Sequence, residues 1–202
     1  MIVILDRQHI GKPNRNDLGA GADLDGDGEI SNDEREANLT IKYIEAAAAY
    51  LMDRGHIVYI LDSGYYSDRH RRACDIARSA PTQKAAYVAC HLNAGGGDYA
   101  VTIHDSRSRG GKSLAECVAE SMKQAAREWI PRSLVRASSP DGSWSRAFNT
   151  IGGIYSGPAS LSGICFEPAF MDCELHRPLL TDAGLVVLGR ALAIGCLRWA
   201  GE

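Results

Sequence analysis

Short apolar runs alternate along this chain with longer helical segments, and this alternation limits the folds that are open to it. Five runs have the length and composition of buried strands, at 2–5, 57–61, 86–91, 99–104 and 164–167. Four longer segments are predicted to be helices, at 32–54, 68–79, 113–129 and 182–199. Strands that alternate with helices are typical of α/β proteins. We expect a single domain over residues 1–202, with a mostly parallel twisted sheet flanked by helices.

Two segments are interpreted as lying outside this core. Between 132 and 160, Ser, Gly and Pro are spread among aromatic residues, which predicts a long irregular loop that has a function or moves. Within the 68–79 helix, Arg69, Arg71 and Arg72 are interpreted as a face in solvent.

Residues 23–34 match the pattern of an EF-hand calcium loop and precede the first long helix. Carboxylates stand at loop positions one, three and five, a glycine at six and a glutamate at twelve. Oxygen atoms at this spacing can surround calcium, which prefers about six to eight of them. We expect a structural Ca²⁺ site formed by Asp23, Asp25, Asp27, Glu29 and Glu34. The alternative is an acidic loop in solvent that binds no ion.

The composition is that of an ordinary globular protein, with 45% hydrophobic and 23% charged residues. A formal net charge of -3 argues against a nucleic-acid-binding surface. No apolar run reaches the length that spans a bilayer, and the apolar start at 2–5 is too short for a signal peptide. We therefore expect neither a nucleic acid nor a membrane as partner. The six cysteines form no Cys-x-x-Cys pair and are interpreted as reduced thiols.

Ionisable residues follow three of the apolar runs. His9 lies just past the first run, His91 ends the third and Glu167 ends the last. Ligands bind at the carboxyl ends of strands in open α/β sheets, so these residues can meet in space. Two imidazoles and one carboxylate form a known catalytic zinc set, with water in the fourth position. A further carboxylate nearby then serves as general base.

Four stretches carry these residues in a fixed order: Asp6-Arg-Gln-His9-Ile-Gly11, Glu36-Ala-Asn-Leu-Thr-Ile41, Cys90-His91-Leu-Asn93 and Glu167-Pro-Ala169-Phe170. They resemble the zinc-dependent N-acetylmuramoyl-L-alanine amidases of the type-3 family, whose pattern is Asp-Pro-Gly-His-Gly-Gly, Glu-x-x-x-x-Leu, Ser-x-His-x-Asn and Glu-x-Gly-Phe. The resemblance covers nearly the whole chain. The first stretch keeps only the aspartate, the histidine and the last glycine of the family motif, and Ala169 replaces a family glycine.

The resemblance implies a peptidoglycan hydrolase that cleaves the amide between N-acetylmuramic acid and L-alanine. It implies Zn²⁺ bound by His9, Glu36 and His91, with Glu167 as catalytic base. Asn93 and His104 are expected to contact the substrate; His104 ends the run next to that of His91.

Glu34 and Glu36 both fit the family's zinc glutamate, since an apolar residue follows each at equal spacing. The distance from the family's leucine to the glycine that ends the helix, here Gly55, selects Glu36. Residues two apart on a helix point about 200° away from each other. Glu34 can therefore face the calcium loop while Glu36 faces the edge of the sheet.

The resemblance and the lack of a signal peptide also predict where the protein is made and where it acts. We expect a monomer made in the cytoplasm without a signal peptide, as a phage endolysin is, which reaches the wall through a separate membrane pore, a holin. Two other functions stay open: a catalytically inactive calcium-binding module that contacts the wall, and a zinc carboxypeptidase-like peptidase. The identity of the new amino termini on digested peptidoglycan distinguishes the amidase from the peptidase.

Overall fold

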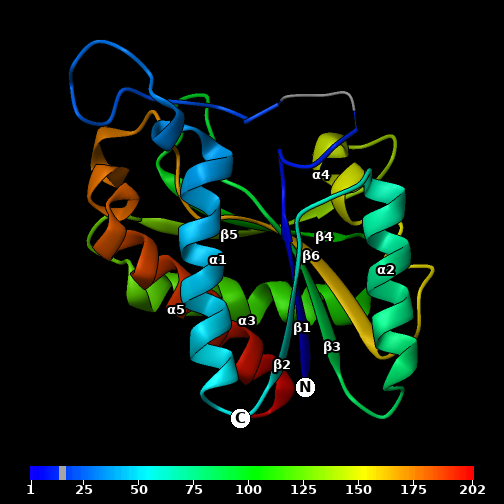
Figure 1. Ribbon diagram of the computed structural model, residues 1–202. Coiled ribbons are helices and arrows are strands. Elements are labelled where there is room, and N and C mark those ends of the chain that lie inside the picture. The colour runs from blue at the N-terminus through cyan, green and yellow to red at the C-terminus, as the bar shows by residue number, and fades with distance from the viewer. Residues whose placement is uncertain (14–16) are drawn as a thin grey trace.

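The computed structural model describes residues 1–13 and 17–202. They form a six-stranded sheet with helices on both faces (Figure 1). In chain order the elements are β1 (Ile2–Arg7), η1 (Asn32–Glu34), α1 (Glu36–Met52), β2 (Ile57–Leu61), α2 (Tyr66–Ser79), β3 (Ala85–Cys90), β4 (Tyr99–Asp105), α3 (Arg109–Ala125), β5 (Arg132–Ser138), α4 (Ser145–Ile151), β6 (Leu161–Glu167), η2 (Glu174–Leu180) and α5 (Asp182–Ala200). This confirms the predicted α/β fold with a mostly parallel sheet.

The strands follow the order β2-β1-β3-β6-β4-β5 across the sheet. Strands β2, β1, β3 and β6 run parallel to one another, while β4 pairs antiparallel with β6 and parallel with β5. The carboxyl ends of β1, β3 and β6 therefore share one edge of the sheet. Strands β4 and β5 end at the opposite edge.

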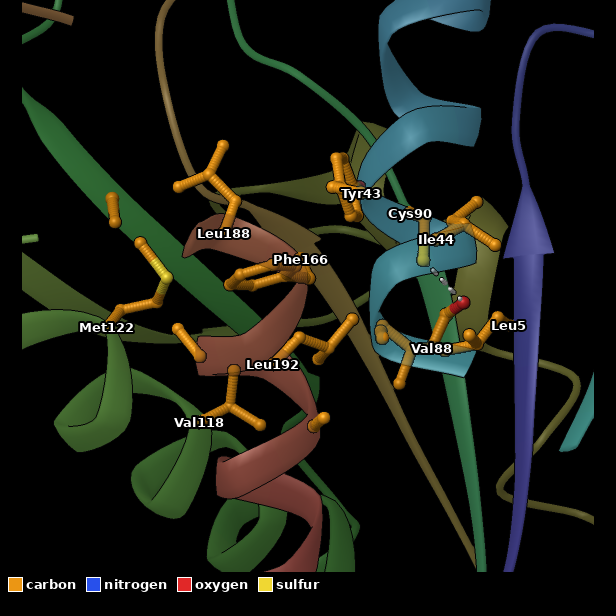
Figure 2. Packing of buried hydrophobic residues seen from close by; sticks show 14 of the residues in the cluster. Leu5, Tyr43, Ile44, Val88, Cys90, Val118, Met122, Phe166, Leu188 and Leu192 are labelled. Carbon is orange, nitrogen blue, oxygen red and sulfur yellow. Dashed lines mark hydrogen bonds between the residues drawn. The ribbon is translucent and has the colours of Figure 1, made fainter. Parts of the chain in front are cut away.

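Side chains alternate between the two faces of the central strands and build two hydrophobic cores. Val3 and Leu5 of β1 pack toward α1, α3 and α5, whereas Ile2 and Ile4 pack on the face covered by α2 and α4. Figure 2 shows the larger core, where Phe166 of β6 lies among side chains of the three helices. Because both faces are covered, the strands β3 and β6 are buried along almost their whole length.

Helix α5 lies between α1 and α3 at short range because glycines face both neighbours. A Cβ atom at Gly189 would be 2.3 Å from the Tyr43 carbonyl oxygen on α1, and one at Gly195 would be 2.5 Å from Val118 Cα on α3. By length and composition α5 could cross a membrane, contrary to the sequence expectation, but 56% of its apolar window is buried inside the protein. Its packing is that of a core helix.

The first long helix begins later than predicted. Residues 32–34 form the short 3-10 turn η1, and Arg35 is extended with φ −86° and ψ 144°, so α1 begins at Glu36. The Glu34 carboxylate accepts the backbone N–H of Ser31 at 2.8 Å, which caps the start of this turn. Glu34 and Glu36 point apart because extended backbone separates them, not because they share one helix.

The segment 132–160 is not the irregular loop that the sequence predicts. It contains the edge strand β5 and the two-turn helix α4. Strand β5 reads as a loop because its polar and charged residues face solvent on an edge that has one neighbour only. Helix α4 is short and begins after Trp144, which has a left-handed backbone with φ 65°.

Candidate metal centre

Three side chains predicted as zinc ligands meet at the edge of the sheet where β1 and β3 end. Glu36 is the first residue of α1, while His9 and His91 follow β1 and β3. One donor atom from each lies within 4.8 Å of the other two. His9 Nε2 is 3.4 Å from Glu36 Oε2, and His91 Nδ1 is 2.9 Å from Glu36 Oε1. The fold thus brings together residues that are far apart in the sequence.

Backbone groups fix the Glu36 carboxylate between the two imidazoles. Its Oε2 atom accepts the N–H of Ala20 at 3.2 Å, and its Oε1 atom accepts the N–H of Leu92 at 3.1 Å. Gly19 has φ 76°, and a Cβ atom there would lie 2.5 Å from Glu36 Oε2, so a larger residue would displace the carboxylate. The segment that leads into the acidic loop therefore contacts the metal centre directly.

The charges of these three groups are coupled. Burial opposes ionisation of Glu36, but the hydrogen bond with His91 and the charges of both imidazoles hold the pKa of Glu36 below its ordinary value. Burial likewise opposes a charge on His91, yet the bond to Glu36 raises the His91 pKa. Burial lowers the pKa of His9, which favours the neutral imidazole that a metal requires.

The donor set fits zinc. Two imidazole nitrogens and one carboxylate oxygen are a known catalytic zinc set that leaves one position open. Tetrahedral ligands at zinc distances are about 3.4 Å apart, and the His9 Nε2 to Glu36 Oε2 distance is 3.4 Å. The Nε2 atom of His91 is buried without a hydrogen-bond partner among the described residues, as expected where a further group is missing.

A buried arginine holds the loop that carries His9. His9 has a left-handed backbone with φ 57°, which is uncommon for a residue other than glycine. Arg69 of α2 donates from Nη1 to the Arg7 carbonyl at 2.5 Å and from Nη2 to the Ile10 carbonyl, so it ties down the backbone on both sides of His9. Arg69 is fully buried, and the interpretation of this residue as part of a solvent face is wrong.

Asp6 is the counter-ion of this arginine. Arg69 Nη1 also donates to Asp6 Oδ1, and both side chains are fully buried. The other oxygen, Oδ2, accepts from Gln8 Nε2 at 2.5 Å and from the Tyr87 hydroxyl. Burial raises the pKa of Asp6, while Arg69 and Tyr87 favour its charged form. No local sequence signal marks Asp6 as buried, because it directly follows the apolar run at 2–5 and precedes polar residues.

Glu167, the predicted base, ends β6 beside the three donors. It lines a cavity of about 300 Å³ together with His9, Glu36 and His91. Burial raises the pKa of Glu167, and His91 opposes this shift. Asn93 Nδ2 donates to Glu167 Oε2 at 2.7 Å, so the predicted substrate contact Asn93 also orients the carboxylate.

The structure does not bring His104 to this group. Because β4 is antiparallel to β6, His104 pairs with Ile164, three residues before Glu167, and the end of β4 lies at the opposite edge of the sheet. His104 is buried, and its Nδ1 atom lies 2.8 Å from the Asp105 carbonyl oxygen. A substrate contact from His104 is therefore not supported by its position.

Three of the five predicted calcium ligands lie together. Carboxylate oxygens of Asp23, Asp25 and Asp27 are within 4.8 Å of one another. The Glu34 carboxylate instead accepts the backbone N–H groups of Ser31 at 2.8 Å and Leu24 at 2.5 Å, and these bonds lower the Glu34 pKa to about 2. Glu29 is exposed. Glu34 therefore binds backbone groups of its own loop. It stands at the twelfth loop position, whose glutamate completes the calcium shell in an EF-hand.

No protein-family model matches the sequence, and no curated protein matches it. Solved structures match over the whole chain. The structure of the CwlD amidase from Clostridioides difficile in complex with the GerS lipoprotein is 17% identical, with a TM-score of 0.69 over 99% of this chain and 98% of that one. The N-acetylmuramoyl-L-alanine amidase AmiC2 of Nostoc punctiforme is 19% identical, with a TM-score of 0.70 over 100% and 98%. The catalytic domain of the CD27L endolysin targeting Clostridia difficile is 12% identical, with a TM-score of 0.65 over 98% and 97%. The chain therefore has the fold of N-acetylmuramoyl-L-alanine amidase catalytic domains.

Proposed function

We propose that this protein is a zinc-dependent amidase that hydrolyses the bond between N-acetylmuramic acid and the L-alanine of peptidoglycan stem peptides. One observation carries the proposal: His9, Glu36 and His91 converge beside Glu167 in a single cavity. The likeness to amidase structures supports the substrate, and the donor set supports the metal.

His9, Glu36 and His91 would hold the zinc ion. When bound, zinc lowers the pKa of water and polarises a carbonyl group. Glu167 accepts the proton of the water whose oxygen forms the new bond to the lactyl carbonyl carbon. When the bond from carbon to nitrogen breaks, Glu167 passes that proton to the amine of alanine.

The central test is the substitution Glu167→Gln, which keeps the size of the side chain and removes the base. We expect this variant to keep about one zinc per chain and to lose clearing of purified cell walls. Chelation of the wild type should abolish clearing, and added zinc should restore it. New amino termini of alanine on the digested wall identify the amidase; new termini within the stem would indicate a peptidase. A variant Glu167→Gln with full activity would remove Glu167 from the mechanism, and a wild type without zinc or activity would favour an inactive binding module.

We further propose that residues 23–34 bind a structural calcium ion, supported by the EF-hand pattern and by the clustered carboxylates of Asp23, Asp25 and Asp27. Binding requires the Glu34 carboxylate to exchange its backbone partners for the ion. Calcium at millimolar concentration should raise the melting temperature of the wild type. The double substitution of Asp25→Ala and Asp27→Ala should remove this rise, and an equal rise in the variant would contradict the site.

We also propose that the protein is a lysin that reaches the wall from the cytoplasm; the likeness to the catalytic domain of the CD27L endolysin supports the role as a lysin. This role is tested by expression in a host with and without a holin. Lysis should require both the holin and Glu167. Lysis without a holin would contradict the proposed route.

A further inference from the structure

Arg146 is a cation beside the candidate metal centre and has no role in the proposed reaction. It is the second residue of α4 and lies on the rim shared by two cavities. Both the cavity of about 300 Å³ around the donors and a neighbouring one of about 420 Å³ are lined by Arg146 and Glu167. Arg146 is exposed, and its guanidinium group has no ion pair with any described residue.

The backbone below Arg146 is anchored. Ala147, Thr150 and Ile151 of α4 are buried, and the Thr150 carbonyl lies 2.8 Å from His70 Nε2 on α2. The Thr150 hydroxyl donates to the Ala147 carbonyl at 2.7 Å. The helix is therefore fixed to the core on one side and presents Arg146 to the cavities on the other.

The charges of the two cavities favour an anionic ligand next to Arg146. The metal-binding carboxylate of Glu36 would be neutralised by its ion, and Glu167 is bonded to Asn93. Among the described residues that line the larger cavity, only Arg146 and Glu167 are charged. A guanidinium group forms two parallel hydrogen bonds with a carboxylate, a stronger contact than a neutral amide provides.

We propose that Arg146 forms a subsite for the carboxylate of the residue that follows alanine in the stem peptide. This inference rests on the proposed function, which places the scissile amide beside Glu167. A peptide extends by about 3.3–3.6 Å per residue, so a carboxylate on the second residue lies about 7 Å from the scissile bond. Arg146 lines both the donor cavity and its neighbour. We take the ligand to be a stem peptide whose second residue is γ-linked D-glutamate with a free α-carboxylate.

Two synthetic N-acetylmuramoyl tripeptides test the subsite, identical except that one has D-isoglutamate and the other its amide, D-isoglutamine, at position two. Arg146→Gln should lower kcat/KM for the acid by about 10- to 100-fold and for the amide by less than about 3-fold. Arg127→Gln is the matched control, since Arg127 is exposed just past α3 and lines neither cavity. The control should change neither substrate. An equal loss on both substrates in Arg146→Gln, or no loss, would overturn the subsite.

A binding measurement separates this inference from the proposed function. If the wild type cleaves neither compound, the proposed function fails. The subsite is then tested only by the binding affinities for the two compounds. Zinc-loaded protein with Glu167→Gln should bind the acid about 10-fold or more tightly than the amide. Adding Arg146→Gln should remove this difference. Equal affinities before that second substitution would contradict the subsite whatever the activity.

Discussion

Replacing Arg69 by methionine tests whether the buried pair with Asp6 holds the loop of His9. The substitution keeps most of the aliphatic stem and removes the guanidinium group, which bonds Asp6 and the carbonyls of Gly64, Arg7 and Ile10. Breaking a buried pair by removing one partner costs about 3–5 kcal/mol, because the other charge stays buried. Against a total stability of about 5–15 kcal/mol, this is a large fraction.

The loss should depend on pH with a defined sign. Without Arg69, the largest cause that remains is burial, which already raises the Asp6 pKa above its ordinary value. An acid with a raised pKa in the folded state stabilises the fold below that pKa, and the stability falls as pH rises through it. Arg69→Met should therefore be more destabilising at pH 8 than at pH 5. Adding Asp6→Asn should recover part of the loss at pH 8, because no buried charge remains.

Urea unfolding at both pH values measures the effect as a shift of the midpoint at constant slope. The control is Arg71→Met on the same helix, where an exposed pair with Asp68 at 3.6 Å should contribute about 0–1 kcal/mol. The Arg69 variant should also bind zinc more weakly, since the backbone beside His9 is released. A cost for Arg69→Met no larger than that of the control would refute the reasoning.

Three further outcomes are expected. Gly195→Ala should cost about 1–3 kcal/mol in thermal unfolding, because its Cβ atom would lie 2.5 Å from Val118 Cα; an unchanged melting temperature would show that α5 can shift. In calcium-free buffer the Glu34 pKa is lowered from 4.5 to about 2, so its contribution to stability is present above pH 4.5 and is lost as pH falls toward 2; the difference between wild type and Glu34→Gln in acid melts should shrink over this range, and a constant difference would contradict it. Asn93→Ala should lower kcat by about 10-fold with zinc content unchanged, because Glu167 loses its 2.7 Å partner; loss of zinc instead would make Asn93 a structural residue.

Three residues of the candidate site follow from local pattern and one general rule, whereas Glu36 is predicted from the resemblance to the amidase family. His91 and Glu167 end apolar runs and His9 lies just past one, and parallel strands place such ends at one edge. The same rule fails for His104, which also ends an apolar run. Strand direction is decided by long-range pairing, and β4 is antiparallel to β6, which no feature of residues 99–104 reveals.

The predictions for Arg69 and for β5 fail for a related reason, because both depend on the tertiary surroundings. An arginine on a helix is usually in solvent, and its burial here depends on Asp6, which is distant in the sequence and adjacent in the fold. Strand β5 has one neighbour and faces solvent, so its residues lack the apolar run that identifies a buried strand.

The metal centre is coupled to two distant parts of the sequence through backbone rather than through metal ligands alone. Glu36 is held by the N–H of Ala20, just before the acidic loop, and His9 by the carbonyl contacts of Arg69 on either side of it. Ordering either segment therefore stabilises the same three-donor geometry, and metal binding must in turn order both segments. Calcium should thus increase zinc affinity, and zinc should increase calcium affinity by the same factor, because linkage between two binding sites is reciprocal.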